Sequence, residues 1–201
     1  MMNYPEPIVK RTYCSQSLTT FRVRKRPRAV HGGGFVVTNS SQRDIFTLDG
    51  CGKTGTSGKL ILRSDSEVEV LTIHRIKALS IYQEWRGSKV GFDDVERLVF
   101  TLKESSSFLV KKNPIKISLK PRSTKKDWDF EIQGSFPNKS CDIVDSRGYI
   151  MAKVWIEDET KNMKISNDYL YNVTVQPGFD QAFVFGVIAV LDNIHDESTR
   201  C

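Results

Sequence analysis

The stretch from Pro177 to Ile194, PGFDQAFVFGVIAVLDNI, is the most apolar part of the chain and stands near the C-terminal end of an otherwise charged sequence. It has no charged residue from Gln181 to Leu191 and no alternation of polar and apolar residues, which favours a helix over a strand. A helix of about 16 residues reaches about 24 Å, whereas crossing a bilayer takes about 20 apolar residues and about 30 Å. A surface helix would need a polar face, which this run lacks. We therefore predict a helix enclosed by protein.

The residues ahead of this helix predict short strands. From about Leu18 to Val175, apolar and polar residues alternate in runs such as GFVVTN (34–39), KLILRS (59–64) and YIMAKVWIED (149–158). Clusters rich in Asn, Asp, Ser and Gly separate the runs, as in tight hairpin turns. Such spacing without intervening helices is typical of an antiparallel sandwich or barrel.

Together the two patterns predict a mainly β fold, a closed antiparallel barrel of about twelve strands around a central C-terminal apolar α-helix. The side chains that we expect to form the core of that helix are Phe183, Val184, Val187, Ile188, Val190 and Leu191.

The length of 201 residues favours one domain, because domains typically hold about 150 residues. We assign residues 18–196 to a single barrel domain, residues 1–17 to an N-terminal extension that we expect to be flexible, and residues 197–201 to a short tail. We expect a monomer.

The charge balance favours an anionic partner, although a mildly basic surface without such a partner is the commoner case. The chain has 30 Lys and Arg against 24 Asp and Glu, a formal net charge of +6, which suits phospholipid headgroups or nucleic acid without choosing between them. The opening MMNYPEPIVKRTYC places prolines and charges where a signal peptide needs an apolar core. We therefore expect an intracellular, soluble protein that is neither secreted nor membrane-spanning; residence at the plasma membrane or in the nucleus stays open.

The cysteines predict neither disulfides nor a metal site. In an intracellular protein they are most simply reduced thiols, and they lie too far apart for a zinc motif. They are Cys14, Cys51, Cys141 and Cys201. We expect no metal and no cofactor.

The chain lacks a recognisable catalytic motif. DGCGKTGTSGK (49–59) resembles a phosphate-binding loop, but Thr47 stands where that motif requires its first glycine, and a strand follows instead of a helix. His31, His74 and His195 are scattered, and neither GxSxG nor HExxH occurs. We predict that the protein is not an enzyme.

Two segments concentrate positive charge, FRVRKRPR (21–28) and KKNPIKISLKPRSTKK (111–126). Alternation along a strand places Arg22, Arg24 and Arg26 on one face. Cations gathered in one patch suit a charged lipid headgroup; solvated charges that guard strands against edge pairing explain them equally well. Aromatic residues do not interleave with the cations, so nucleic acid is the weaker option. The candidate headgroup-binding residues are Arg22, Arg24, Lys25, Arg26, Arg28, Lys111, Lys112, Lys116 and Lys120.

Several blocks of the sequence resemble the plant LURP-one-related family in order and spacing, from about Leu18 to Ile194. They are GFVVTNSSQRDIFTLDG (34–50), LTIHRIKALSIYQEWRGS (71–88), FTLKESSSF (100–108), DFEIQGSF (129–136), CDIVDSRGYIMAKV (141–154) and VTVQPGFDQAFVFGVIAVLDNI (173–194). The resemblance implies a tubby-like fold, a barrel of about twelve strands around an apolar helix, which phospholipid scramblases share. Tubby proteins tether to membranes through phosphoinositides, and the founding LURP-one-related protein is implicated in plant defence.

Two features depart from the family. DGCGKTGTSGK is unusually rich in glycine for its place, and RSDSEVEV (63–70) lacks the glycine usual in that hairpin. The phosphoinositide-binding residues of tubby proteins also have no position-by-position counterparts here. The lipid hypothesis therefore rests on charge, and a protein-interaction scaffold in defence signalling, without lipid preference, remains the alternative.

Overall fold

The computed structural model describes residues 6–27, 32–50, 58–76, 82–91, 95–105, 114–119, 128–157, 169–195 and 198–199. The described elements are η1 (Arg11–Tyr13), β1 (Thr19–Lys25), β2 (Gly34–Thr38), β3 (Asp44–Asp49), β4 (Lys59–Ser64), β5 (Glu69–Ile76), β6 (Tyr82–Val90), β7 (Glu96–Ser105), β8 (Lys116–Ser118), β9 (Phe130–Ser135), β10 (Ser140–Asp145), β11 (Ile150–Trp155), β12 (Tyr169–Val175) and α3 (Gln181–Ile194).

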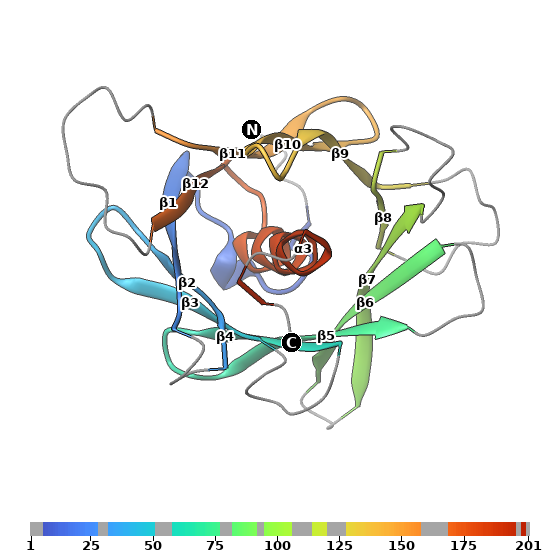
Figure 1. Cartoon of the computed structure of the whole chain (residues 1–201), viewed down its shortest axis with the longest axis horizontal. Coiled ribbons are helices and arrows are strands. Elements are labelled where there is room, and N and C mark those ends of the chain that lie inside the picture. Colours follow the sequence, from blue (N-terminus) through green and yellow to red (C-terminus); the bar gives the residue numbers. More distant parts are fainter. Residues whose placement is uncertain are drawn as a thin grey trace.

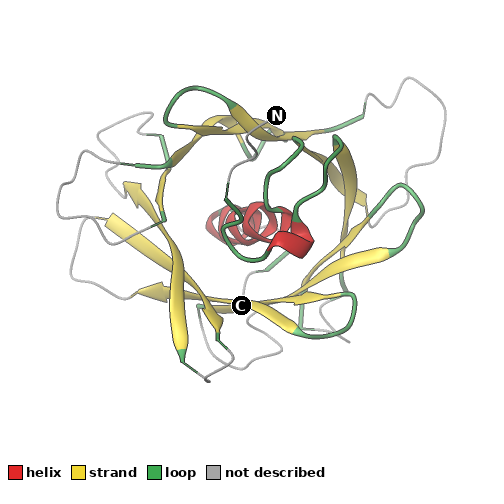
Figure 2. Cartoon of the chain, turned by 180° about the vertical axis from the view of Figure 1, so that it is seen from behind, coloured by secondary structure: helices red, strands yellow, loops and turns green. Residues whose placement is uncertain are grey.

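The twelve described strands form one closed antiparallel barrel in which each strand pairs with its neighbours in sequence. β1 closes the ring by pairing with β12, with Thr19 opposite Val175 and Val23 opposite Tyr171. α3 runs through the middle of the ring (Figure 1), and the view from behind shows the same enclosure (Figure 2). The predicted fold class is confirmed.

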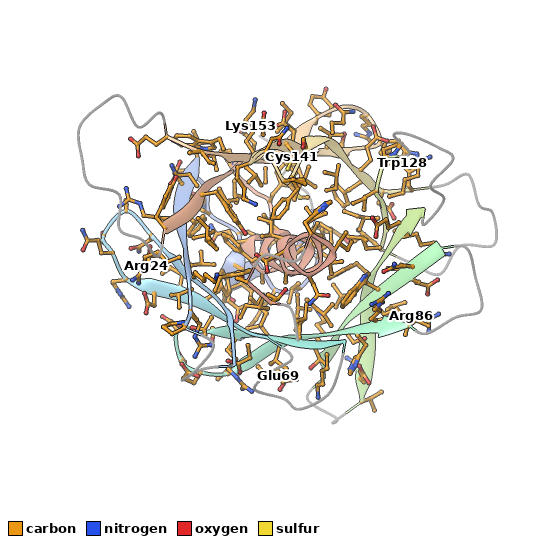
Figure 3. All side chains as sticks on the ribbon, in the orientation of Figure 1. Arg24, Glu69, Arg86, Trp128, Cys141 and Lys153 are labelled. Carbon is orange, nitrogen blue, oxygen red and sulfur yellow. The ribbon has the colours of Figure 1, made fainter. Side chains whose placement is uncertain are left out.

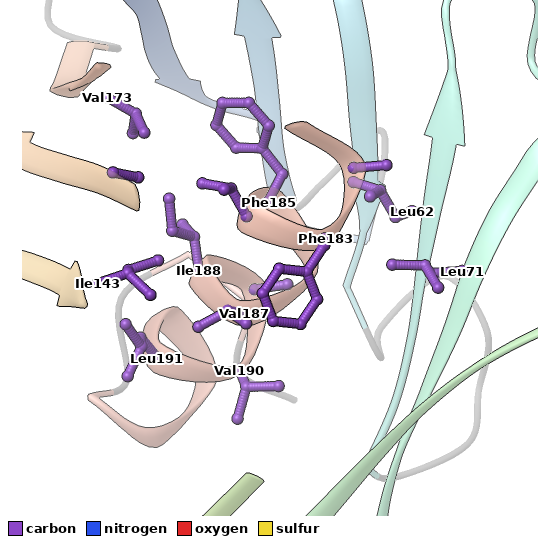
Figure 4. Packing of buried hydrophobic residues seen from close by; sticks show 14 of the residues in the cluster. Leu62, Leu71, Ile143, Val173, Phe183, Phe185, Val187, Ile188, Val190 and Leu191 are labelled. Carbon is purple, nitrogen blue, oxygen red and sulfur yellow. The ribbon is translucent and has the colours of Figure 1, made fainter. Parts of the chain in front are cut away.

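A barrel of this size needs a filling because its lumen is wider than side chains alone can occupy, and a helix with its side chains is about 10–12 Å across. The six core residues predicted for the helix are all fully buried (Figure 4). Phe183 contacts the rings of Phe100 and Phe130, with centroids 5.6 Å and 5.2 Å away. Phe185 contacts rings from β1 and β3. Its ring centroid lies 5.3 Å from that of Phe21 and 5.6 Å from that of Phe46.

One glycine of the helix allows a close approach to the barrel wall. A Cβ atom at Gly186 would lie 2.8 Å from Leu71 Cδ1 and 3.3 Å from the ring of Phe100. Contacts shorter than about 3 Å require the neighbours to shift, and cores at native density resist this. Gly186 thus explains how α3 packs directly on β5 and β7.

A buried aspartate at each end of α3 holds a terminal segment of the chain. Asp180 caps the helix by accepting a hydrogen bond from the Phe183 N–H at 3.2 Å. It also accepts from the backbone N–H groups of Val9 at 2.7 Å and Lys10 at 2.9 Å. Flexibility of residues 1–17 stays a prediction; the described part, from Glu6, is bonded to the helix start.

At the other end of α3, Asp192 accepts from the backbone N–H groups of Ser198 at 3.0 Å and Thr199 at 2.9 Å, and from the Ser198 hydroxyl. The Ser198 carbonyl in turn accepts from the Gly34 N–H at 2.7 Å, which connects the tail to β2. Ser198 and Thr199 are both fully buried. The described part of the predicted tail is therefore integrated into the barrel.

Candidate functional site

Residues 21–25 of the first basic segment lie in β1, where strand alternation separates core from surface. Phe21 and Val23 are buried, whereas Arg22 points outward and is exposed. Arg22 lies opposite Asn172 on β12, and its guanidinium carbon is 5.9 Å from the centre of the Tyr169 ring. Burial raises the pKa of Tyr169, and the positive charge of Arg22 acts against that rise.

The next two cations differ in their partners. Arg24 lies 3.3 Å from Asp44 on β3, with 42% and 57% of the side chains exposed, so the pair contributes little to stability. Lys25 is exposed at the end of β1. Within the described ranges, neither Arg22 nor Lys25 forms an ion pair.

Arg26 belongs to a buried ion-pair cluster, which we call the Asp49 triad (Arg26, Asp49 and Arg63). Arg26 Nη1 lies 2.7 Å from one carboxylate oxygen of Asp49, and Arg63 Nε lies 2.9 Å from the other. Asp49 is 2% exposed and Arg26 11%. Arg26 therefore neutralises a buried carboxylate across β1, β3 and β4 and is not displayed for a ligand.

The described part of the second cationic segment, residues 114–119, lies on the opposite side of the barrel. Lys116 on β8 has its Nζ 5.7 Å from the centre of the Trp128 ring. Four strands separate β8 from β1 by the shorter way around the ring, and Figure 3 shows Trp128 and Arg24 on opposite sides. The described cations of the two segments do not form one patch. The candidates outside the described residues are Arg28, Lys111, Lys112 and Lys120.

Two side chains of β11 near Arg22, Lys153 and Trp155, belong to the same surface but were not predicted from the sequence. Trp155 on β11 lies opposite Asn172, which lies opposite Arg22, so the three form one row across β11, β12 and β1. Trp155 is 37% exposed, and its indole N–H donates to Thr174 Oγ1 at 3.0 Å. Lys153 is the neighbouring outward residue of β11. The alternation in AKVW, with Ala152 and Val154 buried, is the signal that could have found Lys153 and Trp155.

We call this surface the β11–β12–β1 face and define it by Arg22, Lys25, Lys153, Trp155 and Tyr169; Asn172, between Trp155 and Arg22 in the row, is buried. A shallow groove of about 430 Å³ adjoins it, lined partly by Lys153 and Trp155. Lys153 lies 3.8 Å from Asp142, so one acidic partner offsets part of its charge. The face combines cations, aromatic rings and hydrogen-bonding groups, an arrangement suited to the interface between water and lipid.

Cys141 lies on the inward side of β10, and its thiol is only weakly acidic. Burial raises the pKa of its thiol to about 12, and the neighbouring Asp142 adds to the rise. Cys14 and Cys141 are free cysteines in the described part of the chain, while Cys51 and Cys201 lie outside it, so the expectation of four reduced thiols stays a prediction.

The burial of Cys141 predicts its reactivity. In the folded protein at pH 8, iodoacetamide should modify Cys141 about 10³-fold or more slowly than a free thiol, because the thiolate is the reacting form. Unfolding in guanidinium should remove the protection. Peptide mass spectrometry over a time course measures this, with the half-buried Cys14 as internal comparison; labelling of native Cys141 at the rate of a free thiol would contradict the buried position.

Neither a metal centre nor a membrane-crossing helix is found in the described part of the chain. Its His, Cys, Asp and Glu residues include no group of three or more placed to hold an ion. Among the described helices, none is long and apolar enough to cross a bilayer.

Comparisons with known proteins identify relatives of this chain. A family model described as LURP-one-related matches residues 19–192. Protein LURP-one-related 6 of Arabidopsis thaliana is 41% identical, covering 96% of this chain and 98% of its own length. Protein LURP-one-related 16 of the same plant is 44% identical, and the match covers 98% of this chain and 96% of the relative. Protein LURP1 of the same plant is 25% identical, with 96% of this chain and 92% of the relative covered. No solved structure matches.

Proposed function

The chain belongs to the LURP-one-related family, and within it we propose that this protein binds anionic phospholipid headgroups at a membrane surface through the β11–β12–β1 face. The observation that carries the proposal is the pair of exposed cations without ion-pair partners among the described residues, Arg22 and Lys25, beside Trp155 and Tyr169. Each cation close to an anionic bilayer contributes about 1 kcal/mol. Trp and Tyr are enriched where one end of the ring is apolar and the other wet.

The proposal narrows the set of candidate residues. Arg22 and Lys25 carry the attraction, and Arg24 contributes through its exposed side while Asp44 offsets its charge. Lys153 and Trp155 extend the face across β11. Arg26 stabilises the fold through Asp49, and Lys116 faces away from this surface.

Vesicle flotation tests the proposal. We expect the wild-type protein to float with vesicles that contain phosphatidylserine or phosphoinositides, to remain in solution with pure phosphatidylcholine, and to bind less as salt rises. Arg22→Ser should lower the partition coefficient about fivefold, and Arg22→Ser with Lys25→Ser about thirtyfold, if each cation contributes about 1 kcal/mol.

Lys116→Ser is the matched control for Arg22→Ser. Both are exposed strand cations above an aromatic ring, and they lie on opposite sides of the barrel. Loss of binding in both variants by the same factor would show a diffuse charge effect and refute a specific face. Equal recovery with neutral and anionic vesicles would refute lipid binding and favour the alternative, a protein-interaction scaffold. A role in plant defence and the absence of enzymatic activity stay predictions.

A further inference from the structure

A pocket of about 880 Å³ opens at the end of the barrel where α3 ends. None of the residues that define the β11–β12–β1 face lines this pocket. Its walls come from the end of β7, from Pro114 and Ile115 just ahead of β8, from the β9–β10 hairpin and from the end of α3. The apolar part of the lining includes Ile115, Ile132, Phe136 and Leu191. Small-molecule sites have this size and this mainly apolar character, with a few polar groups that orient the ligand.

The polar group that distinguishes the pocket is Glu104. Phe100 and Leu102 are buried core residues of β7, and Glu104 continues their inward side to the mouth of the barrel, where it is half-buried. Among the described residues, nothing forms a hydrogen bond or an ion pair with its carboxylate. A partly desolvated carboxylate without a partner costs free energy that a ligand cation would recover.

The charges around Glu104 act in two directions on a bound cation: the Glu104 carboxylate and the C-terminal end of α3 attract it, whereas Arg75 on β5 repels it. Burial raises the pKa of Glu104, and the positive charge of Arg75 on β5 acts against that rise. The carboxyl end of α3, which carries the negative end of the helix dipole, also meets the pocket through Leu191 and the capping residue His195. The His195 ring is stacked on Phe136 at 5.9 Å and forms a flat wall beside the apolar lining.

We propose that this pocket binds a small organic amine with an apolar body. The ammonium group pairs with the Glu104 carboxylate at the mouth, and the body lies against the half-buried Ile115 and the ring of His195. The pocket contains none of the residues that define the β11–β12–β1 face, although it shares Gln133, Gly134 and Ser140 with the groove beside that face.

Three probes with one apolar body and different head groups test the proposal: 2-phenylethylamine, 2-phenylethanol and 3-phenylpropionate. We expect NMR titration of the ¹⁵N-labelled protein to show the amine binding about tenfold or more tightly than the alcohol, because a charge-assisted hydrogen bond replaces a neutral one. The carboxylate should bind most weakly. The shifted amides should include those of Ile115, Ile132 and His195.

Glu104→Gln should bring the amine and the alcohol to within about twofold of each other while leaving the affinity for the alcohol unchanged. Glu96→Gln is the matched control, since Glu96 is exposed at the start of the same strand, β7, and lines neither this pocket nor the groove beside the β11–β12–β1 face. It should keep the preference for the amine. Equal affinities for the three probes, a preference that survives Glu104→Gln, or shifts confined to other parts of the barrel would overturn the proposal.

Discussion

Val187→Asp is expected to abolish the folded state. Val187 lies on α3 in the middle of the barrel and is fully buried (Figure 4). An unpaired carboxylate there costs several kcal/mol, against a total stability of about 5–15 kcal/mol for a domain. The lost methyl groups also remove packing around the helix axis. Circular dichroism and size-exclusion chromatography of the purified variant should show no cooperative thermal transition.

Val68→Asp is the matched control for this prediction. It is the same substitution at a valine that is 60% exposed in the turn between β4 and β5. Surface substitutions away from special features usually change stability by about 0.5 kcal/mol or less, so Val68→Asp should unfold close to the wild-type temperature. A soluble Val187→Asp protein with a wild-type transition would contradict the central position of α3.

Asp49→Ala should have the second largest effect, a loss of about 3–5 kcal/mol in the free energy of unfolding. The change leaves Arg26 and Arg63 in the wall of the barrel without the carboxylate between them. Breaking a buried ion pair by removing one partner has a cost of this size, because the remaining charge stays desolvated. Equilibrium unfolding in urea measures the difference, provided the slope with denaturant is unchanged.

Asp44→Ala provides the comparison on the same strand. Asp44 also pairs with an arginine of β1, but its side chain is 57% exposed, so we expect a loss of only about 0–1 kcal/mol. Replacing Arg26, Asp49 and Arg63 together by apolar residues of similar size should recover much of the lost stability. Equal losses for Asp49→Ala and Asp44→Ala would show that burial of the triad does not matter to the fold.

The barrel and its helix were predictable because both are encoded in local periodicity. Alternation in β1 places Phe21 and Val23 inside the barrel. The run from Gln181 to Leu191 carries no charge and has no polar face that could lie against water. Enclosure of the helix then follows from elementary burial. These signals need no knowledge of which strands become neighbours.

The candidate site was less predictable because it depends on strand order and register. The sequence places Arg22, Arg24 and Arg26 two residues apart, but their partners come from β12 and β3, far away along the chain. Similarly, the opposite placement of Lys116 follows from its position halfway around a closed ring. Trp155 joins Arg22 only through the pairing of β11 with β12 and of β12 with β1.

The two aspartates of α3 show the same limit. An aspartate three residues ahead of Phe183 is a helix-capping signal that sequence reasoning could have used. Its bonds to Val9 and Lys10 span about 170 residues, and those of Asp192 to Ser198 and Thr199 require the chain to turn back sharply after the helix. Local patterns carry no information on contacts of this kind.

The position of α3 at the end of the strand order determines when the domain can fold during synthesis. Chains grow at about 5–20 residues per second, so β12 and α3 leave the ribosome roughly ten to thirty seconds after β1. Until then the ring lacks its closing strand and its interior has no filling, and the apolar inner faces of the earlier strands stay open to chaperones and to aggregation. A premature stop codon ahead of α3 would therefore remove the centre of the barrel, and the nascent chain should depend on chaperones until α3 has been made.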